Sequence, residues 1–305
     1  MKLSRRLTTA IAPLAVLLTA GAVDQTRAAA QSPASASNAR ATPDEPPGAV
    51  IDGEADRLLR AMSTTLTGTQ RFALEAEEVF DEIPDAGPRR SLSNLRRIAI
   101  ERPNRAISDV TGESANRSVW FDGGHLTVLD KEQNAYAALD APKTIHEMLD
   151  WAADEYGIDV PLSDLFYPDL YAMLTKGVIR GEYLGLQAVE GTPCHHLAFE
   201  QETIDWQIWI DAGASPVPRK MTIAYKTEVG EPQYTVFIRS WNLHPTFPAE
   251  MFRFEAPEGA SEMQIDKVLD SDQATSSDDS PPVGVSADEP KPGPAEAKPK
   301  PEDHR

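Results

Sequence analysis

The sequence has almost no cysteine and none of the common catalytic signatures. Its 305 residues include one cysteine, Cys194, so no disulfide can form within the chain. A free cysteine is usually a small buried hydrophobe; a reactive thiol or a disulfide to a partner is the alternative. There is no Gly-x-Ser-x-Gly elbow, phosphate-binding loop or dinucleotide fingerprint. These absences favour a domain that is held together by its own core and that binds a ligand rather than catalysing a reaction. No cofactor is expected.

Positive charge is also scarce. The chain has 29 lysines and arginines against 48 aspartates and glutamates, which gives a formal net charge of −19. Such a balance argues against nucleic acid or an anionic membrane surface as the main partner. Part of the acidity lies in the C-terminal tail, so it says less about the folded surface.

Long apolar runs are absent beyond the N-terminus. A basic start is followed by an apolar run from Leu7 to Val23 and by the small residues Ala28 to Ala30. This pattern predicts a signal peptide cleaved after Ala30, with an uncleaved anchor as the alternative. The mature chain is then periplasmic and has no transmembrane segment. Cys194 lies far from the cleavage site, which excludes a lipoprotein anchored through an N-terminal cysteine.

Four consecutive strands organise the second half of the chain. They are predicted at Cys194–Gln201, Asp205–Asp211, Arg219–Thr227 and Gln233–Trp241. In the second strand, Trp206, Ile208 and Ile210 alternate with Gln207, Trp209 and Asp211, as expected for a strand with two different faces. Short connectors join these strands and force antiparallel pairing, because a parallel pair needs a long crossover.

The first half combines helices with further strands. Asp52 is a predicted N-cap, and Ala55, Leu58, Leu59, Met62 and Leu66 follow at helical spacing. Gly181 and Gly185 are predicted bulge or bend points in a strand. The remaining predicted strands are Gln70–Phe80, Leu92–Glu101, Arg105–Thr111, Arg117–Phe121, Leu126–Leu129, Asn134–Ala138, Val178–Val189 and a short edge strand at Phe252–Phe254. The remaining predicted helices are Pro142–Tyr156 and one or two short ones in Leu162–Leu174, interrupted at Pro168.

This order of elements predicts an α+β fold. Strands come in two blocks with helices before and between them, which excludes a doubly wound sheet and favours one curved antiparallel sheet with helices against its concave side. The predicted organisation is a signal peptide (1–30), a flexible linker (31–48), one folded domain (49–265) and a disordered acidic, proline-rich tail (266–305). The tail has either no role or a role in recruitment or as a linker that spans the cell wall.

Several motifs resemble one bacterial family of predicted periplasmic proteins of unknown function. They are Gly191–Phe199, Asp205–Asp211 and Pro218–Lys220, preceded by Phe121–Gly124, Tyr136 and Pro142. That family resembles the LolA-like and LolB-like lipoprotein carriers, and the resemblance covers nearly all of Asp52 to Ile265. It implies a half-open antiparallel barrel with helices plugging an apolar cavity, and no catalytic residues. The acidic tail and the helices between the strand blocks depart from the better-known carriers, which puts transfer between two membranes in doubt.

Cys194, His195 and His196 are the densest group of metal-ligand side chains. On a strand, Cys194 and His196 share one face and His195 takes the other, so two ligands at most converge there. The remaining ligands must come from distant parts of the fold, from His125, His146 or His244. The sequence therefore predicts no metal site, with histidines satisfied by hydrogen bonds.

Paired carboxylates are the strongest signal for an enzyme. Asp122, Asp205 and Asp211 are candidates for glycoside chemistry, which needs two such groups. All three lie beside turns, where aspartate is favoured for local hydrogen bonding. A hydrolase is thus the least favoured of the three functions considered.

The apolar strand faces support the leading hypothesis. A carrier that binds a lipid, an acyl chain or another apolar ligand would line its site with Phe72, Leu74, Trp120, Tyr183, Phe199, Trp206, Ile208 and Tyr225. The alternative is that the helices cover these side chains as an ordinary core. A cell-envelope sensor or scaffold with the same fold and a protein partner is the second functional hypothesis. The sequence does not name the ligand.

Overall fold

A computed structural model describes residues 50–84, 86–158, 160–248, 250–265 and 267. The predicted signal peptide, the predicted linker and nearly all of the predicted tail lie outside these residues. Within the described ranges, no helix has the length and apolar character needed to span a membrane.

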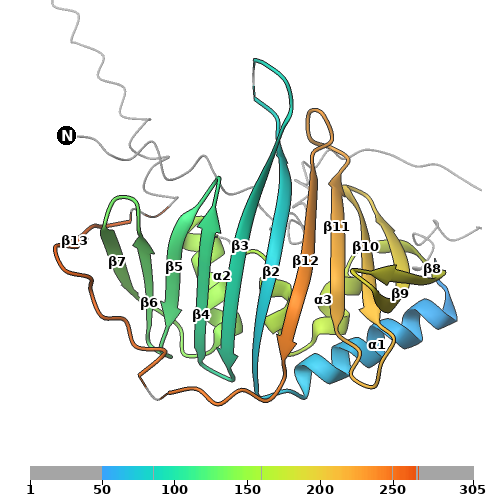
Figure 1. Cartoon of the computed structure of the whole chain (residues 1–305), viewed down its shortest axis with the longest axis horizontal. Coiled ribbons are helices and arrows are strands. Elements are labelled where there is room, and N and C mark those ends of the chain that lie inside the picture. The colour runs from blue at the N-terminus through green and yellow to red at the C-terminus, as the bar shows by residue number, and fades with distance from the viewer. Residues whose placement is uncertain (1–49, 85, 159, 249, 266, 268–305) are drawn as a thin grey trace, which may run out of the picture.

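The described residues form one curved, open sheet, drawn in Figure 1. Its 13 strands run in the order β1-β8-β9-β10-β11-β12-β2-β3-β4-β5-β6-β7-β13. All neighbours are antiparallel except the short outer strands, since β1 pairs with β8 and β13 with β7 in parallel. The predicted curved antiparallel sheet is therefore confirmed. The strands are β1 (Val50–Ile51), β2 (Arg71–Glu82), β3 (Arg90–Glu101), β4 (Arg105–Gly112), β5 (Asn116–Phe121), β6 (His125–Asp130), β7 (Ala135–Asp140), β8 (Val178–Val189), β9 (Thr192–Gln201), β10 (Ile204–Asp211), β11 (Pro218–Tyr225), β12 (Gln233–Asn242) and β13 (Ser261–Glu262).

The helices lie together on one side of the sheet, behind its lower part in Figure 1. They are α1 (Gly53–Thr67), α2 (Ile145–Tyr156), the 3₁₀ helix η2 (Ser163–Phe166) and α3 (Leu170–Thr175). α2 begins three residues later than predicted, because the Thr144 hydroxyl accepts from the backbone N–H of Glu147 and caps the helix there. Gly157 ends it in the left-handed conformation, with φ of 62°.

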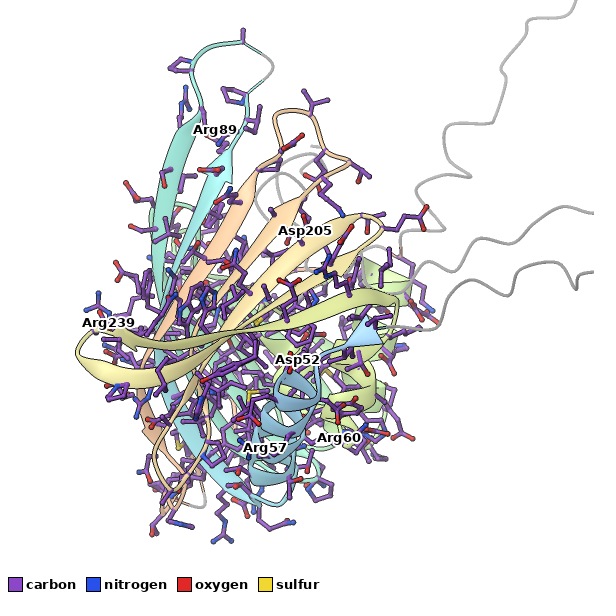
Figure 2. All side chains as sticks on the ribbon, turned by 90° about the vertical axis from the view of Figure 1, so that its right-hand side faces the viewer. Asp52, Arg57, Arg60, Arg89, Asp205 and Arg239 are labelled. Atoms are coloured by element: carbon purple, nitrogen blue, oxygen red, sulfur yellow. The ribbon has the colours of Figure 1, made fainter. Side chains whose placement is uncertain are left out.

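Helix α1 follows the predicted pattern closely. The Asp52 carboxylate accepts from the backbone N–H groups of Glu54 and Ala55 at 2.7 and 3.4 Å, and Figure 2 shows Asp52 where β1 gives way to the helix. The five predicted apolar side chains are all buried. The short apolar stripe is stabilised by the sheet behind it, since an isolated helix of this length is marginal in water.

Loss of this cap should destabilise the protein measurably. We expect Asp52→Ala to lower the free energy of unfolding by about 1 kcal/mol, because two N–H groups of the first turn lose their acceptor. Urea unfolding followed by circular dichroism measures this. Asp52→Asn is the matched control, because asparagine caps nearly as well; equal losses in both variants would contradict the assignment.

The two faces of the sheet differ in what they contact. Trp206, Ile208 and Ile210 pack into the main core beneath the helices, as their alternation predicted. Trp209 lies on the opposite, convex face in a small cluster with Cys194. Figure 2 shows Arg239 on the side of the sheet away from α1. The concave face is thus the one that the helices cover.

The segment after β12 corrects one prediction. Phe252–Phe254 is not a strand; the final strand is β13, further along the chain. Phe252 is buried, and the ring of Phe254 packs against Trp120 and Tyr136 with centroids 5.1 and 5.0 Å apart. The aromatic pattern of this segment therefore reflects side-chain packing on the convex face rather than backbone pairing.

Two glycines of β8 have different roles. Gly185 has φ of +96° beside a shift in register, which agrees with the predicted bulge. At Gly181, an added Cβ would come within 2.8 Å of the Phe199 ring. Glycine is needed there for the close approach of an aromatic side chain.

Candidate functional site

The concave wall brings together seven of the eight side chains predicted to line a ligand site. Six of them are 0 to 5% exposed and belong to the main core: Phe72, Leu74, Phe199, Trp206, Ile208 and Tyr225. Tyr183 on β8 is half-buried and packs against the same core. Its hydroxyl lies 3.0 Å from Nδ1 of His195. The wall crosses strands that are far apart in the sequence, so only the sheet assembles it.

Trp120 does not belong to this wall. Its neighbours Val119 and Phe121 face the main core, so alternation along β5 turns Trp120 to the convex face against Phe254. The assignment of Trp120 to the predicted cavity is therefore corrected. Its large aromatic area is explained by contact with the segment that crosses the convex face.

The wall is covered by the chain's own helices. Buried side chains of all four helices join the same core cluster, including Met62 of α1, Leu149 of α2 and Leu170 of α3. Phe166 of η2 lies 6.0 Å from Phe72 between ring centroids. In this structure, the helices therefore cover the predicted lining residues as an ordinary core. A ligand can reach the wall only if the helices move.

Arg102 connects the rim of the sheet to the helices. It lies in the turn between β3 and β4 and donates from Nη1 to the carbonyl of Phe166 and from Nη2 to that of Leu165. Its guanidinium also lies over the Phe72 ring at 5.8 Å. Within the described residues it forms no ion pair, and its buried Nε has no acceptor. Burial lowers the pKa of Arg102, because a low-dielectric site disfavours the charged form.

A buried ion pair lies further along the concave wall. Arg96 of β3 donates to Glu78 of β2 through Nε at 2.7 Å and Nη2 at 3.0 Å. The Tyr234 hydroxyl also donates to Glu78, and Arg96 Nη1 donates to Ser108. Burial and the Glu78 carboxylate raise the pKa of Tyr234 well above its usual range. The residue patterns did not predict this group, although Glu78 shares its face with Phe72 and Leu74 and breaks their apolar alternation.

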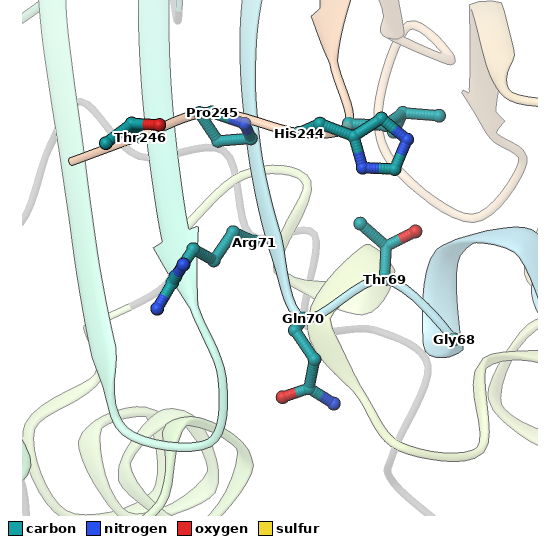
Figure 3. Close-up of a pocket in the computed structure, with 8 residues that line it drawn as sticks. Gly68, Thr69, Gln70, Arg71, His244, Pro245 and Thr246 are labelled. Carbon is teal, nitrogen blue, oxygen red and sulfur yellow. The ribbon is translucent and has the colours of Figure 1, made fainter.

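The sheet rim also carries an open pocket of about 430 Å³. It lies where α1 leads into β2 and β12 leaves the sheet (Figure 3). The predicted lining residues do not contribute to it. Its walls are Gly68, Thr69, Gln70, Arg71, Leu243, His244, Pro245 and Thr246.

A family model described as a predicted periplasmic protein, DUF2092, matches residues 55–266. The chain belongs to this DUF2092 family. Membership confirms the family predicted from the motifs and the periplasmic location predicted from the N-terminus. No curated protein matches the chain.

Several solved structures are similar to this DUF2092 chain at low identity. An uncharacterized conserved protein from Thermus thermophilus is 9% identical with a TM-score of 0.41, over 69% of this chain and 98% of that one. Mycobacterium tuberculosis lipoprotein LppX is 11% identical with a TM-score of 0.38, over 64% and 98%. A LolA superfamily protein from Nitrosomonas europaea is 8% identical with a TM-score of 0.31, over 66% and 97%. The architecture described above follows from the strand pairing of this chain and not from these similar structures.

The cysteine and histidine run divides between the two faces as predicted. Cys194 and His196 lie on the convex face, where His196 stacks on Trp209 at 4.1 Å between centroids and its Nε2 lies 2.8 Å from Gln207. His195 lies on the concave side beside Tyr183. Within the part of the chain that the structure describes, no three His, Cys, Asp or Glu side chains are grouped to hold a metal.

The Cys194 thiol should be inert in the folded protein. It is fully buried, and burial followed by the nearby Asp211 raises its pKa. We expect a thiol-reactive dye to label the native protein far more slowly at pH 8 than the protein unfolded in urea, because the thiolate is the reactive form. Rapid labelling without urea would support the reactive-thiol alternative.

The candidate acids make local contacts. Asp122 accepts from the backbone N–H groups of Gly124 and His125 at 2.9 and 2.8 Å, as turn aspartates do. Asp211 pairs with Arg219 at 2.8 Å, and Asp205 pairs with Lys226 at 2.9 Å. Each carboxylate therefore has a structural partner, and their geometry offers no support for hydrolysis.

Proposed function

We propose that this protein is a periplasmic carrier that binds an apolar ligand, such as a lipid or an acyl chain, between the concave wall and the helices. The observation that carries the proposal is the bonding of Arg102. A half-buried arginine with two carbonyl acceptors on η2 and no ion pair in the described residues connects the sheet to the helices through hydrogen bonds alone, so the helices can separate from the sheet without breaking an ion pair. Beneath it lies a continuous aromatic and aliphatic surface.

The energetics of such a site need no covalent chemistry. Burial of apolar surface contributes roughly 25 cal/mol per Å², so an acyl chain that buries about 300 Å² gains roughly 7 kcal/mol. Part of this gain offsets the free energy of displacing helices that already cover the wall. Binding is therefore expected to be reversible, which suits a carrier.

Binding of a fluorescent fatty acid analogue tests the proposal. We expect saturable binding to the mature protein, competition by an unlabelled lipid, and co-purifying lipid in native mass spectra of gently purified protein. The matched control is the protein unfolded in urea, which has no assembled wall. Protein that is free of lipid and shows no saturable binding would overturn the proposal.

A further inference from the structure

The polar group on the concave wall forms a band that spans three strands and three successive same-face positions of the register. Along β2, the concave positions are apolar until Glu78. Along β3, they change after Ile98 to Arg96 and Asn94, and along β12 they change after Val236 to Tyr234. Asn94 lies directly opposite Glu78 in the register. Arg96 lies opposite Ala76 and Tyr234 opposite Phe80, one same-face position to either side of Glu78, so the band exists only on the assembled wall.

The band interrupts the apolar wall between Ala76 and Phe80 of β2. Glu78 is six residues after Phe72, which corresponds to about 20 Å along β2 at roughly 3.3 Å per residue. Figure 1 shows the helices behind the lower part of the sheet, with the β2–β3 hairpin extending past them. A molecule that lay along the apolar positions from Phe72 to Ala76 would place one end at Glu78 and Arg96.

The ion pair leaves specific hydrogen-bonding capacity. A guanidinium has five N–H donors, and Arg96 uses three of them for Glu78 and Ser108 within the described residues. One N–H on each Nη is available. Glu78 accepts three hydrogen bonds and neutralises the charge of Arg96. The side chains of Arg96 and Glu78 are only 8% and 2% exposed.

This chemistry selects an oxygen acceptor without charge. A carboxylate or phosphate head would place a second negative charge beside Glu78 in a low-dielectric site, which is unfavourable. An ester or amide carbonyl accepts the free N–H groups without that repulsion. Replacing a buried ion pair by apolar residues is often neutral or stabilising, so stability alone does not account for the pair.

We infer that the ligand is an uncharged acyl ester or amide, whose tail lies on the apolar wall and whose carbonyl accepts from Arg96. The inference rests on the proposed carrier function and names its ligand class. Ser108 and Tyr234 hold Arg96 and Glu78 in place and are positioning residues. The apolar positions from Phe72 to Ala76 contact the tail.

Competition by two lipids with the same tail tests the inference. At pH 8, we expect 1-monopalmitoylglycerol to displace a fluorescent apolar probe about tenfold more effectively than palmitate, which corresponds to about 1.4 kcal/mol. The variant with both Glu78→Met and Arg96→Met should bind the two lipids with similar affinity, because the carbonyl has lost its donors and the carboxylate its repulsion.

The same strands offer a matched control. Glu75 and Arg97 form an ion pair of 2.8 Å on β2 and β3 with both side chains exposed, on the convex face. Glu75→Met with Arg97→Met should keep the preference for the ester. If the buried double variant does not fold, Glu78→Gln removes the negative charge that repels a carboxylate, leaves Arg96 its donors and should also lose the preference.

The outcomes separate this inference from the carrier proposal. An ester preference that disappears only in the buried variants supports it. A preference that persists in them, or a wild type that favours palmitate, overturns the inference and leaves the carrier proposal standing. If neither lipid displaces a probe and no probe binds, both are overturned.

Discussion

Replacement of Arg102 by leucine is expected to make the wall more accessible by about ten- to a hundredfold. The side chain donates to the carbonyls of Leu165 and Phe166, and hydrogen bonds from charged donors contribute about 1.5–3 kcal/mol. Their loss shifts the equilibrium between covered and uncovered states by that amount, since each 1.4 kcal/mol is tenfold. Leucine retains contact with the Phe72 ring, so the sheet itself is little changed.

Stopped-flow fluorescence with an apolar probe measures this effect. We expect faster entry and faster release in Arg102→Leu than in the wild type. Arg105→Leu is the matched control, because Arg105 lies in the same turn region but pairs with Glu101 of the sheet at 2.6 Å rather than with a helix. Equal rates in both variants and the wild type would show that Arg102 does not limit access.

The largest loss of stability is expected for Phe72→Ala. We expect the free energy of unfolding to fall by about 3–5 kcal/mol, the range for a buried phenylalanine truncated to alanine. Phe72 is 0% exposed and packs between Phe166 of η2 and Trp241 of β12, with ring centroids 6.0 and 5.8 Å away. Its removal opens a cavity at the contact between the helices and the sheet.

Urea unfolding of Phe72→Ala and Phe237→Ala tests this prediction. Phe237 lies on the convex face, is only half-buried and contacts Lys220, so its truncation should cost clearly less. We also expect Phe72→Ala to bind apolar probes more tightly than the wild type if it remains folded, because an apolar cavity can hold an apolar ligand. Similar losses in both variants would contradict the assignment of Phe72 to the main core.

The sequence allowed most elements to be predicted because their signals are local. The cap at Asp52, the stop at Gly157 and the alternation around Trp206 each depend on residues within one turn or one strand. The errors have equally specific reasons. Phe252 and Phe254 have the pattern of a strand, but one buried and one half-buried aromatic side chain produce that pattern without pairing. The two-residue strand β1 is too short to show any pattern.

Arg102 and the Glu78–Arg96 pair show why the candidate site was only partly predictable. An arginine before a proline in a turn has no local feature that predicts a buried bond to a helix 63 residues away. Glu78 does interrupt an apolar face, and that signal was present in the sequence. Its partner Arg96 becomes apparent only when the register of β2 and β3 is known.

Residue patterns alone were enough to place most of the strands, the helices, the single buried cysteine and the side chains that share a face of each of those strands. They could not show which face is concave, because alternation is symmetric between the two sides of a sheet. Trp120 and Trp206 alternate equally well, yet one packs against Phe254 on the convex face and the other against the helices. The assembled fold makes this distinction, since the concave face is defined by the direction in which the whole sheet curves and by where the helices pack.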